Sequence, residues 1–321
     1  MASRELAVGM IFLLQTLIGI LGNVSLLSHY ISLHHTDHRL KPTDLLLMHL
    51  TISNSLYIVF LGVPQTMEAF GLKEFFSNSG CELLFYFYRV SRGVSMSTTC
   101  ILSVFQTVRV SPIDSCWKNL RVKAPKYVGF SISICWILYM FVNLIFPVYN
   151  LHESTKCSSK DIMRKRDLGY CSVKEFGNLS GILYAALVIF PEVVLSMLTI
   201  WASCSMVFTL LRHKQQVQHI HVAPKSSAES RATQSILLLV STFMCFYTLS
   251  SALHACWAIL HNPIRWLVNT TTLITLCFPT VSPFLLMRRG STIATFFFGW
   301  TWNRKPTYHY RNKYVANCIY Q

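Results

Sequence analysis

Residues 6–36 read LAVGMIFLLQTLIGILGNVSLLSHYISLHHT, a stretch without a single Asp, Glu, Lys or Arg. A helix needs about 20 apolar residues to cross the hydrocarbon core of a bilayer, so this stretch is long enough to span it. Six further windows hold at most one charged residue: 45–67, 93–108, 127–152, 176–211, 232–264 and 266–287. The window at 93–108 reaches the length of a span when the apolar run is extended back to Leu83, across Arg89 and Arg92. The pattern predicts an all-α membrane protein, a bundle of seven transmembrane helices.

The composition of the 321 residues excludes several other classes of protein. The chain is 52% hydrophobic and 13% charged, whereas a soluble domain carries about 25% charged residues. A disordered chain would be polar and highly charged. The formal net charge of +15 does not indicate nucleic-acid binding, because no solvated domain remains on which the basic residues could cluster.

The sequence lacks the common motifs of enzymes and metal sites. It contains no glycine-rich phosphate loop, no His-Glu-x-x-His, no Cys-x-x-Cys and no Gly-x-Ser-x-Gly. Six of the twelve histidines occur in two groups, and we interpret both groups as solvated loop residues: His34, His35, His38, His213, His219 and His221. We therefore expect no enzyme activity, no metal and no cofactor.

The basic residues between the spans indicate the orientation in the membrane. With the N-terminus outside, 17 of the 28 Lys and Arg residues lie on the inner side and nine on the outer side, as the positive-inside rule requires. The basic cluster at 156–166 argues the other way. The sequon at Asn178, with Cys157 and Cys171 nearby, supports placing this long loop outside, because glycosylation and disulfides occur on the extracellular side of a membrane protein.

The remaining segments complete the expected domain organisation. Residues 1–289 are expected to form the seven-helix domain, with the first span as an uncleaved signal-anchor. Residues 290–321 are expected to form a cytoplasmic tail. Its start, STIATFFFGW at 291–300, is too short to span a bilayer and follows two arginines, so it suits a short amphipathic helix in the membrane interface.

Three ionisable side chains lie deep enough in the spans to be candidates for function, because charges in a membrane are costly. Arg89 and Arg92 are three residues apart and are expected to share a helix face, and Glu192 can reach that face from the fifth span. One reading is an internal salt bridge. The other is that two arginines against one carboxylate leave a positive charge for a ligand.

A second group of polar residues sits deeper in the bundle. Asn23, Asn54 and the carbonyl freed by Pro283 can form one hydrogen-bonded cluster, since unsatisfied polar groups in hydrocarbon cost several kcal/mol. The cluster is either static glue between helices or a hinge that moves when the bundle switches.

Several features resemble the rhodopsin-like receptors: seven spans, Gly22-Asn23, Cys81 at the start of the third span and a lone Trp136 in the fourth. Other features depart from that group. The triplet Phe105-Gln106-Thr107 stands where most members carry Asp-Arg-Tyr. Asn54 replaces the usual Asp, and the seventh span reads FPTVSPF at 278–284.

These departures together resemble the vomeronasal type-1 pheromone receptors. The matching stretches are HLTISN (49–54), FQTVRVSP (105–112), YCS (170–172), WASCSMVF (201–208), HKQQVQHIH (213–221), SRATQSILLLVSTF (230–243) and FPTVSPFLL (278–286). The resemblance implies a multi-pass receptor of the plasma membrane. It also implies a small, pheromone-like ligand and a heterotrimeric G protein of the inhibitory class.

Three other functions are compatible with seven spans but fit the residues less well. A transporter or channel would need a polar path through the whole bundle, whereas the charges here stop in the outer half. A bitter-taste-like receptor is the nearest rival among receptors, and HKQQVQHIH beside SRATQ argues against it. An opsin needs a Schiff-base Lys in the seventh span, and none lies between Trp266 and Met287.

The receptor interpretation carries specific expectations for residues. The outer disulfide is expected between Cys81 and Cys171, with Cys157 as the competitor, and the six cysteines within spans are expected to be free. Gln106 is expected to be a switch position. Because it is not an Arg, it can form hydrogen bonds but not the ion pair that would hold the inactive state at this site. The ligand pocket is expected to open outward between the second, third, fifth, sixth and seventh spans. Its candidate residues are Phe85, Tyr88, Arg89, Arg92, Phe190, Glu192, Tyr247 and Trp257.

These residues also indicate the chemistry of the ligand. The third span has no Asp to bind a ligand ammonium, and its arginines suit bidentate binding of sulfate or carboxylate. We expect a small, mostly apolar ligand that is neutral or anionic, a steroid sulfate being one candidate.

Overall fold

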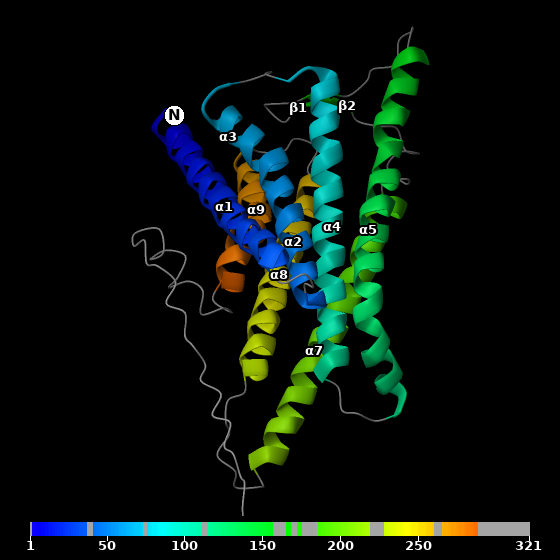
Figure 1. The fold of residues 1–321 in the computed structure, drawn as a ribbon. Coiled ribbons are helices and arrows are strands. Elements are labelled where there is room, and N and C mark those ends of the chain that lie inside the picture. The colour runs from blue at the N-terminus through cyan, green and yellow to red at the C-terminus, as the bar shows by residue number, and fades with distance from the viewer. Residues whose placement is uncertain are drawn as a thin grey trace, which may run out of the picture.

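A computed structural model describes residues 2–36, 41–72, 76–110, 115–156, 165–167, 172–174, 185–218, 228–259 and 265–287. The helices are α1 (Ala2–Thr36), α2 (Pro42–Tyr57), η1 (Ile58–Gly62), α3 (Val63–Ala69), α4 (Asn78–Val110), α5 (Ser115–Lys156), η2 (Ala185–Ile189), α7 (Phe190–Gln218), α8 (Ala228–Ile259) and α9 (Arg265–Met287). Because α2, η1 and α3 run on as one rod, as do η2 and α7, the described helices make seven spans (Figure 1). The predicted seven-helix bundle is confirmed.

Both π-helical turns, η1 and η2, stand directly before a proline. Pro64 follows η1 and Pro191 follows η2, each by two residues. Proline has no N–H to donate and its ring crowds the carbonyl four residues earlier. A wider π turn is one way in which a long helix accommodates such a break.

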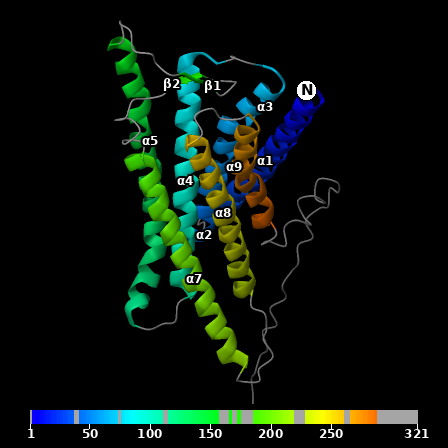
Figure 2. The same cartoon turned by 180° about the vertical axis from the view of Figure 1, so that it is seen from behind.

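Helix α4 is the centre of the bundle. It packs against α2, α5, α7 and α8, and Figures 1 and 2 show it between these helices from both sides. Six spans are apolar enough to be recognised as membrane helices by composition, and α4 is not among them. Its polar residues are instead buried inside the bundle: Ser91, Ser95, Ser97, Thr98, Thr99 and Ser103.

Apolar side chains cover both the interior and the outer surface. The main interior cluster joins α2, α4 and α8 through residues such as Leu50, Met96 and Leu239. Large apolar side chains also point outward, among them Phe130 and Phe141 of α5 and Phe208 of α7. An apolar exterior of this kind suits a helix bundle that is surrounded by lipid.

A small antiparallel hairpin of β1 (Lys165–Asp167) and β2 (Ser172–Lys174) lies in the long loop, an element that the sequence patterns do not indicate. Figures 1 and 2 show the hairpin, the N-terminus and the start of α4 at the same end of the bundle. This is the end predicted to face outside. The helix expected at 291–300 lies outside the described residues.

Helices α1 and α9 approach each other closely at Gly22. A Cβ atom added there would lie 2.9 Å from Cγ of Pro283 and 3.3 Å from the ring of Phe284. The proline ring is rigid, so it cannot swing aside. Glycine at this position therefore allows α1 to lie against the proline-containing part of α9.

This close approach predicts that Gly22→Ala destabilises the bundle, because overpacking of a tight contact typically costs about 1–3 kcal/mol. Gly129→Ala is the matched control, since its added Cβ would meet nothing nearer than 3.7 Å. Thermal denaturation of the purified protein in detergent measures both. Equal midpoints for the two variants would contradict the tight contact at Gly22.

Candidate functional site

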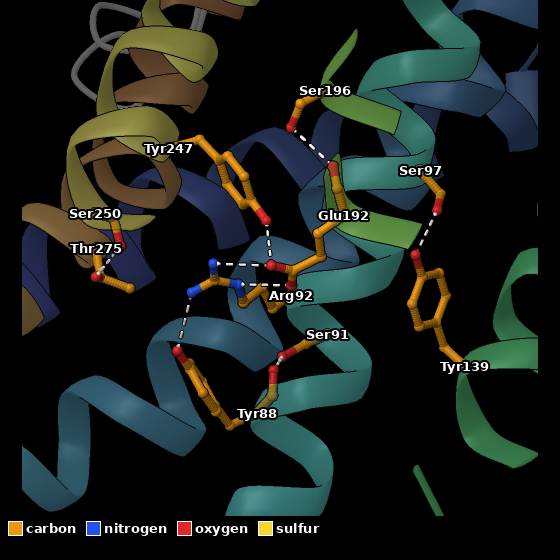
Figure 3. Close-up of polar contacts among 10 residues, drawn as sticks. All are labelled: Tyr88, Ser91, Arg92, Ser97, Tyr139, Glu192, Ser196, Tyr247, Ser250 and Thr275. Carbon is orange, nitrogen blue, oxygen red and sulfur yellow. Dashed lines mark hydrogen bonds and ion pairs between the residues drawn. The ribbon is translucent and has the colours of Figure 1, made fainter. Parts of the chain in front are cut away.

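Arg92 of α4 and Glu192 of α7 form an ion pair inside the bundle (Figure 3). Arg92 Nε donates to Glu192 Oε1 at 3.1 Å, and Arg92 Nη2 donates to Glu192 Oε2 at 3.3 Å. Both side chains are largely buried, with 14% and 16% of their surface exposed. The two parallel bonds are the bidentate geometry that makes guanidinium–carboxylate pairs strong and well oriented.

Two tyrosines complete the surroundings of this pair. The Tyr247 hydroxyl of α8 donates to Glu192 Oε2, and its ring lies 4.9 Å from the Arg92 guanidinium carbon. Arg92 Nη1 donates to the Tyr88 hydroxyl at 3.4 Å. Tyr88 in turn stacks on Tyr57 of α2. One buried cation therefore links α2, α4, α7 and α8.

Arg89 points away from this cluster. Its guanidinium carbon lies 4.4 Å from the ring centroid of Phe146 on α5, whereas Arg92 faces α7 and α8. The expectation that the two arginines share one face is therefore wrong. A three-residue step turns a helix by about 300°, so the two side chains leave the axis about 60° apart. Here this difference is enough for Arg89 to contact α5 and Arg92 to contact α7 and α8. The cluster at Arg92 holds one cation and one carboxylate, not a surplus of positive charge.

A cavity of about 30 Å³ opens beside Arg92, among α2, α4, α8 and α9. Its aromatic wall consists of Tyr57, Phe243, Phe246, Tyr247 and Phe278. Its polar groups are Arg92, Ser95, Ser250 and Thr275. This volume holds about one water molecule, so a ligand of ordinary size can enter only when the walls move.

The expected pocket residues divide into those at this cavity and those elsewhere. Tyr247 and Arg92 line it, and Tyr88 and Glu192 contact Arg92. Phe85 instead packs beside Cys81. It lies on the same face of α4 as Arg92, but seven residues or roughly 10 Å closer to the outer end.

Phe190 requires a correction. Its side chain is 66% exposed and lies on the outer surface of α7. It is two residues from Glu192, which is a turn of about 200° on a helix, so the two side chains face opposite ways. The Trp257 side chain lies outside the described residues.

Several cavity residues were not anticipated from the sequence: Tyr57, Ser95, Phe243, Phe246, Ser250, Thr275 and Phe278. Helical spacing could have found some of them. Ser95 stands three residues after Arg92, and Ser250 stands three after Tyr247, so each lies one helical turn from its neighbour and about 60° from it around the axis. In these two cases the step keeps both residues at the same cavity. Ionisable and aromatic side chains stand out in an apolar span, whereas serine and threonine hydroxyls are common there and do not by themselves indicate a site.

A hydrogen-bonded chain of polar groups crosses four helices below the cavity. Asn23 Nδ2 of α1 donates to the Pro279 carbonyl at 2.9 Å, the carbonyl that Pro283 leaves without its helical N–H partner. Ser282 Oγ donates to the same oxygen at 3.4 Å. Asn54 Nδ2 donates to Ser282 Oγ at 2.9 Å, and Ser95 Oγ donates to Asn54 Oδ1 at 2.8 Å.

This geometry brings Asn23, Asn54 and the carbonyl freed by Pro283 together as expected, with two serines between them. An aromatic stack connects the chain to the ion pair above. Tyr247 stacks on Phe243 at 5.5 Å, and Phe243 meets Phe278 edge-on at 4.7 Å. Phe278 is the neighbour of Pro279 in sequence, so the two polar clusters are joined through packed rings.

Gln106 lies near the inner end of α4 and is 2% exposed. Its amide nitrogen has no hydrogen-bond partner in the part of the chain that the structure describes. The neighbouring Thr107 donates to the Ala202 carbonyl of α7 at 2.8 Å. A switching role for Gln106 remains a prediction.

The cysteines separate into two groups. Cys100, Cys135, Cys204, Cys245, Cys256 and Cys277 are free, as expected for the cysteines within spans. Cys81 is disulfide-bonded. Cys171 and Asn178 lie outside the described residues. Among the described side chains, no group of three His, Cys, Asp or Glu could hold a metal ion.

Comparison with known proteins assigns the chain to a family. The model of the vomeronasal organ pheromone receptor family matches residues 6–299. Vomeronasal type-1 receptor 4 of Homo sapiens is 50% identical over 303 residues, which cover 94% of this chain and 99% of that protein. The chain belongs to the vomeronasal type-1 receptor family.

Two further relatives and a solved structure are also similar to this chain. The human vomeronasal type-1 receptor 2 is 48% identical, covering 86% of this chain and 70% of that protein. An olfactory receptor class A-like protein of Danio rerio is 28% identical, covering 87% and 88%. Squid rhodopsin superposes with a TM-score of 0.66 at 14% identity, covering 93% of this chain and 86% of the rhodopsin chain.

The vomeronasal family and the rhodopsin-like fold determine the class of function. The protein is a chemosensory receptor with the fold of G-protein-coupled receptors, and it is not an enzyme. It is a multi-pass protein of the plasma membrane. Membership of this class implies both a ligand and a G-protein partner.

The ion pair predicts strongly non-additive effects of mutation in this vomeronasal receptor. Glu192→Gln leaves the Arg92 guanidinium buried without its counter-charge, which typically costs about 3–5 kcal/mol. The double variant Arg92→Gln with Glu192→Gln removes both charges and should recover much of that loss. Thermal unfolding of the unaltered receptor, of Arg92→Gln, of Glu192→Gln and of the double variant gives the coupling energy. A double variant as unstable as the sum of the single variants would contradict a direct pair.

Proposed function

We propose that this receptor binds a small, mostly apolar molecule, neutral or anionic, in the cavity beside Arg92, and that binding activates a G protein of the inhibitory class. The observation that carries the ligand proposal is the position of Arg92. Its guanidinium lines the cavity, and no acidic side chain is found among the described lining residues. A ligand entering from the cavity therefore meets a cation.

The Arg92–Glu192 pair supports a preference for anions over amines. A sulfate, sulfonate or carboxylate can form the same two parallel bonds to the guanidinium that Glu192 forms now. An ammonium would find the nearby carboxylate already bound by Arg92 and Tyr247. A steroid sulfate remains one candidate for the anion.

The aromatic wall supports a mostly apolar ligand body. Tyr57, Tyr247, Phe243 and Phe278 present rings to the cavity, and small-molecule sites typically combine such walls with a few placed polar groups. Because the cavity is small in this state, binding has to separate α8 and α9 from α4. The stack from Tyr247 to Phe278 offers a route by which this movement reaches the Pro279 carbonyl.

The inner side of the bundle is the proposed surface for the G protein. Lys123 of α5 and Arg212 of α7 are exposed basic side chains near the inner ends of their helices. Part of this positive charge follows from topology alone. The assignment to the inhibitory class rests on the resemblance of the whole chain to the vomeronasal receptors, and Gln106 is proposed as the switch position behind this surface.

The ligand proposal predicts that Arg92→Gln selectively weakens the response to anions. In cells that express the receptor, the concentration of a sulfated agonist needed for half-maximal response should rise roughly tenfold or more, because a charge-assisted bond contributes about 1.5–3 kcal/mol. The desulfated analogue should change little. Pertussis toxin, which blocks inhibitory-class G proteins, should abolish both responses.

Arg89→Gln is the matched control, since Arg89 faces Phe146 and not the cavity. Surface expression of each variant is measured in the same cells. Equal losses of potency for the sulfated and the desulfated compound would make Arg92 a structural residue. A response that survives pertussis toxin would contradict the inhibitory class.

A disulfide between Cys81 and Cys171 is proposed to hold the outer loop over the bundle, with Asn178 glycosylated on the same side. Strand β2, which begins one residue after Cys171, contacts α4, and Cys81 lies in the first turn of α4. Disulfides of this kind contribute about 2–4 kcal/mol.

Peptide mapping under non-reducing conditions is expected to recover a peptide that joins Cys81 to Cys171. Cys171→Ser should lower the thermal midpoint and the amount of receptor at the cell surface, while Cys204→Ser, at a free and exposed thiol, serves as the control. A peptide that joins Cys81 to Cys157 would overturn the pairing.

A further inference from the structure

Two hydroxyls from different helices meet at the wall of the cavity. Ser250 Oγ of α8 and Thr275 Oγ1 of α9 lie 2.6 Å apart (Figure 3). Both residues are buried, at 3% and 6% exposure, and both line the cavity. The pair is therefore hidden from lipid and faces the space that a ligand would occupy.

This arrangement differs from that of neighbouring hydroxyls on the same two helices. Thr271 and Thr272 of α9 donate to the carbonyls of Leu267 and Val268, and Thr248 of α8 donates to Met244. Such bonds to the preceding turn satisfy a hydroxyl without any partner from outside the helix. Ser250 and Thr275 bond to each other instead.

The Ser250–Thr275 pair has one hydroxyl proton left to donate. Two hydroxyls carry two protons, and the bond between them uses one. The second proton has no acceptor among the residues that the structure describes. A buried donor gains most from a partner, so the pair is prepared to donate one hydrogen bond into the cavity.

We propose that Ser250 and Thr275 form a second recognition point, which takes a neutral oxygen of the ligand, a ketone or hydroxyl. This inference rests on the proposed function, because it places the ligand in the same cavity. The ligand class is then a compact, rigid, apolar molecule with two polar groups. Its acidic group binds Arg92 and its neutral oxygen binds the hydroxyl pair.

The spacing of the two recognition points limits the size of the ligand. Ser250 stands three residues after Tyr247 on α8, roughly 4.5 Å further along the helix axis, and the Tyr247 ring contacts Arg92. Because both recognition points also line the same small cavity, a compact body of one or two rings is suited to reach both. Camphor-10-sulfonate has this form, with a bicyclic apolar body, a sulfonate and a ketone.

Binding of three related probes to the purified receptor tests the inference. The probes are camphor-10-sulfonate, bornane-10-sulfonate, which lacks the ketone, and camphor, which lacks the sulfonate. Dissociation constants are obtained from ligand-dependent shifts of the thermal midpoint. In the unaltered receptor, loss of the ketone should weaken binding roughly three- to tenfold, the worth of one neutral hydrogen bond.

Thr275→Val and Ser250→Ala should abolish this ketone preference while leaving the affinity for bornane-10-sulfonate nearly unchanged. Thr271→Val is the matched control, because its hydroxyl is buried on the same helix but bonded to Leu267. It should keep the preference. A ketone preference that survives in both cavity variants, or that is absent from the unaltered receptor, overturns the inference, as does failure of camphor-10-sulfonate to bind.

The same probes separate this inference from the proposed function. The ratio of affinities for camphor-10-sulfonate and camphor reports the sulfonate contact, and Arg92→Gln should abolish it. If that ratio depends on Arg92 while the ketone preference ignores Thr275, the inference is wrong and the proposed anion site stands. If the ketone preference depends on Thr275 and the sulfonate ratio ignores Arg92, the hydroxyl site stands and the anion site is wrong.

Discussion

The architecture of this receptor depends on one buried ion pair, Arg92 with Glu192. A guanidinium within a membrane bundle must be neutralised and hydrogen-bonded, because the surrounding hydrocarbon offers no partner. Glu192 provides the counter-charge from α7. Tyr247 donates a hydrogen bond to Glu192, and Tyr88 accepts one from Arg92. This requirement draws α4 to the centre of the bundle and brings α7 and α8 against it. The same pair leaves a charged group at the wall of the cavity, where a ligand can compete for it.

A second constraint comes from proline. Pro283 leaves the Pro279 carbonyl without its helical partner, and Asn23 and Ser282 donate to it. Asn54 and Ser95 extend these bonds to α2 and α4. The rings of Tyr247, Phe243 and Phe278 lie between this network and the ion pair. Movement of Tyr247 on ligand binding would therefore displace the packed rings next to Pro279, in the part of α9 where the regular helical hydrogen bonds are already interrupted.

The sequence was sufficient for the spans, the family and the polar residues that meet in the bundle. Uncharged windows identify membrane helices because the cost of burying charge is large and independent of packing. The direction of a side chain within the bundle depends on small helix rotations that the sequence does not specify. For this reason Arg89 was assigned to the face of Arg92, and Phe190 to the pocket. The Ser250–Thr275 pair was missed because most helical hydroxyls bond within their own helix, and only the packing of α8 on α9 reveals the exception.

An experimental structure of the receptor with an anionic agonist and its G protein tests the role of the ion pair most directly. The quantity to measure is the distance between the Arg92 guanidinium and the Glu192 carboxylate, now 3.1 Å at its shortest. We predict that the acidic group of the agonist accepts two hydrogen bonds from the Arg92 guanidinium, with Glu192 beyond hydrogen-bonding distance and α8 displaced from α4. An agonist bound elsewhere, with the Arg92–Glu192 pair unchanged, would contradict it.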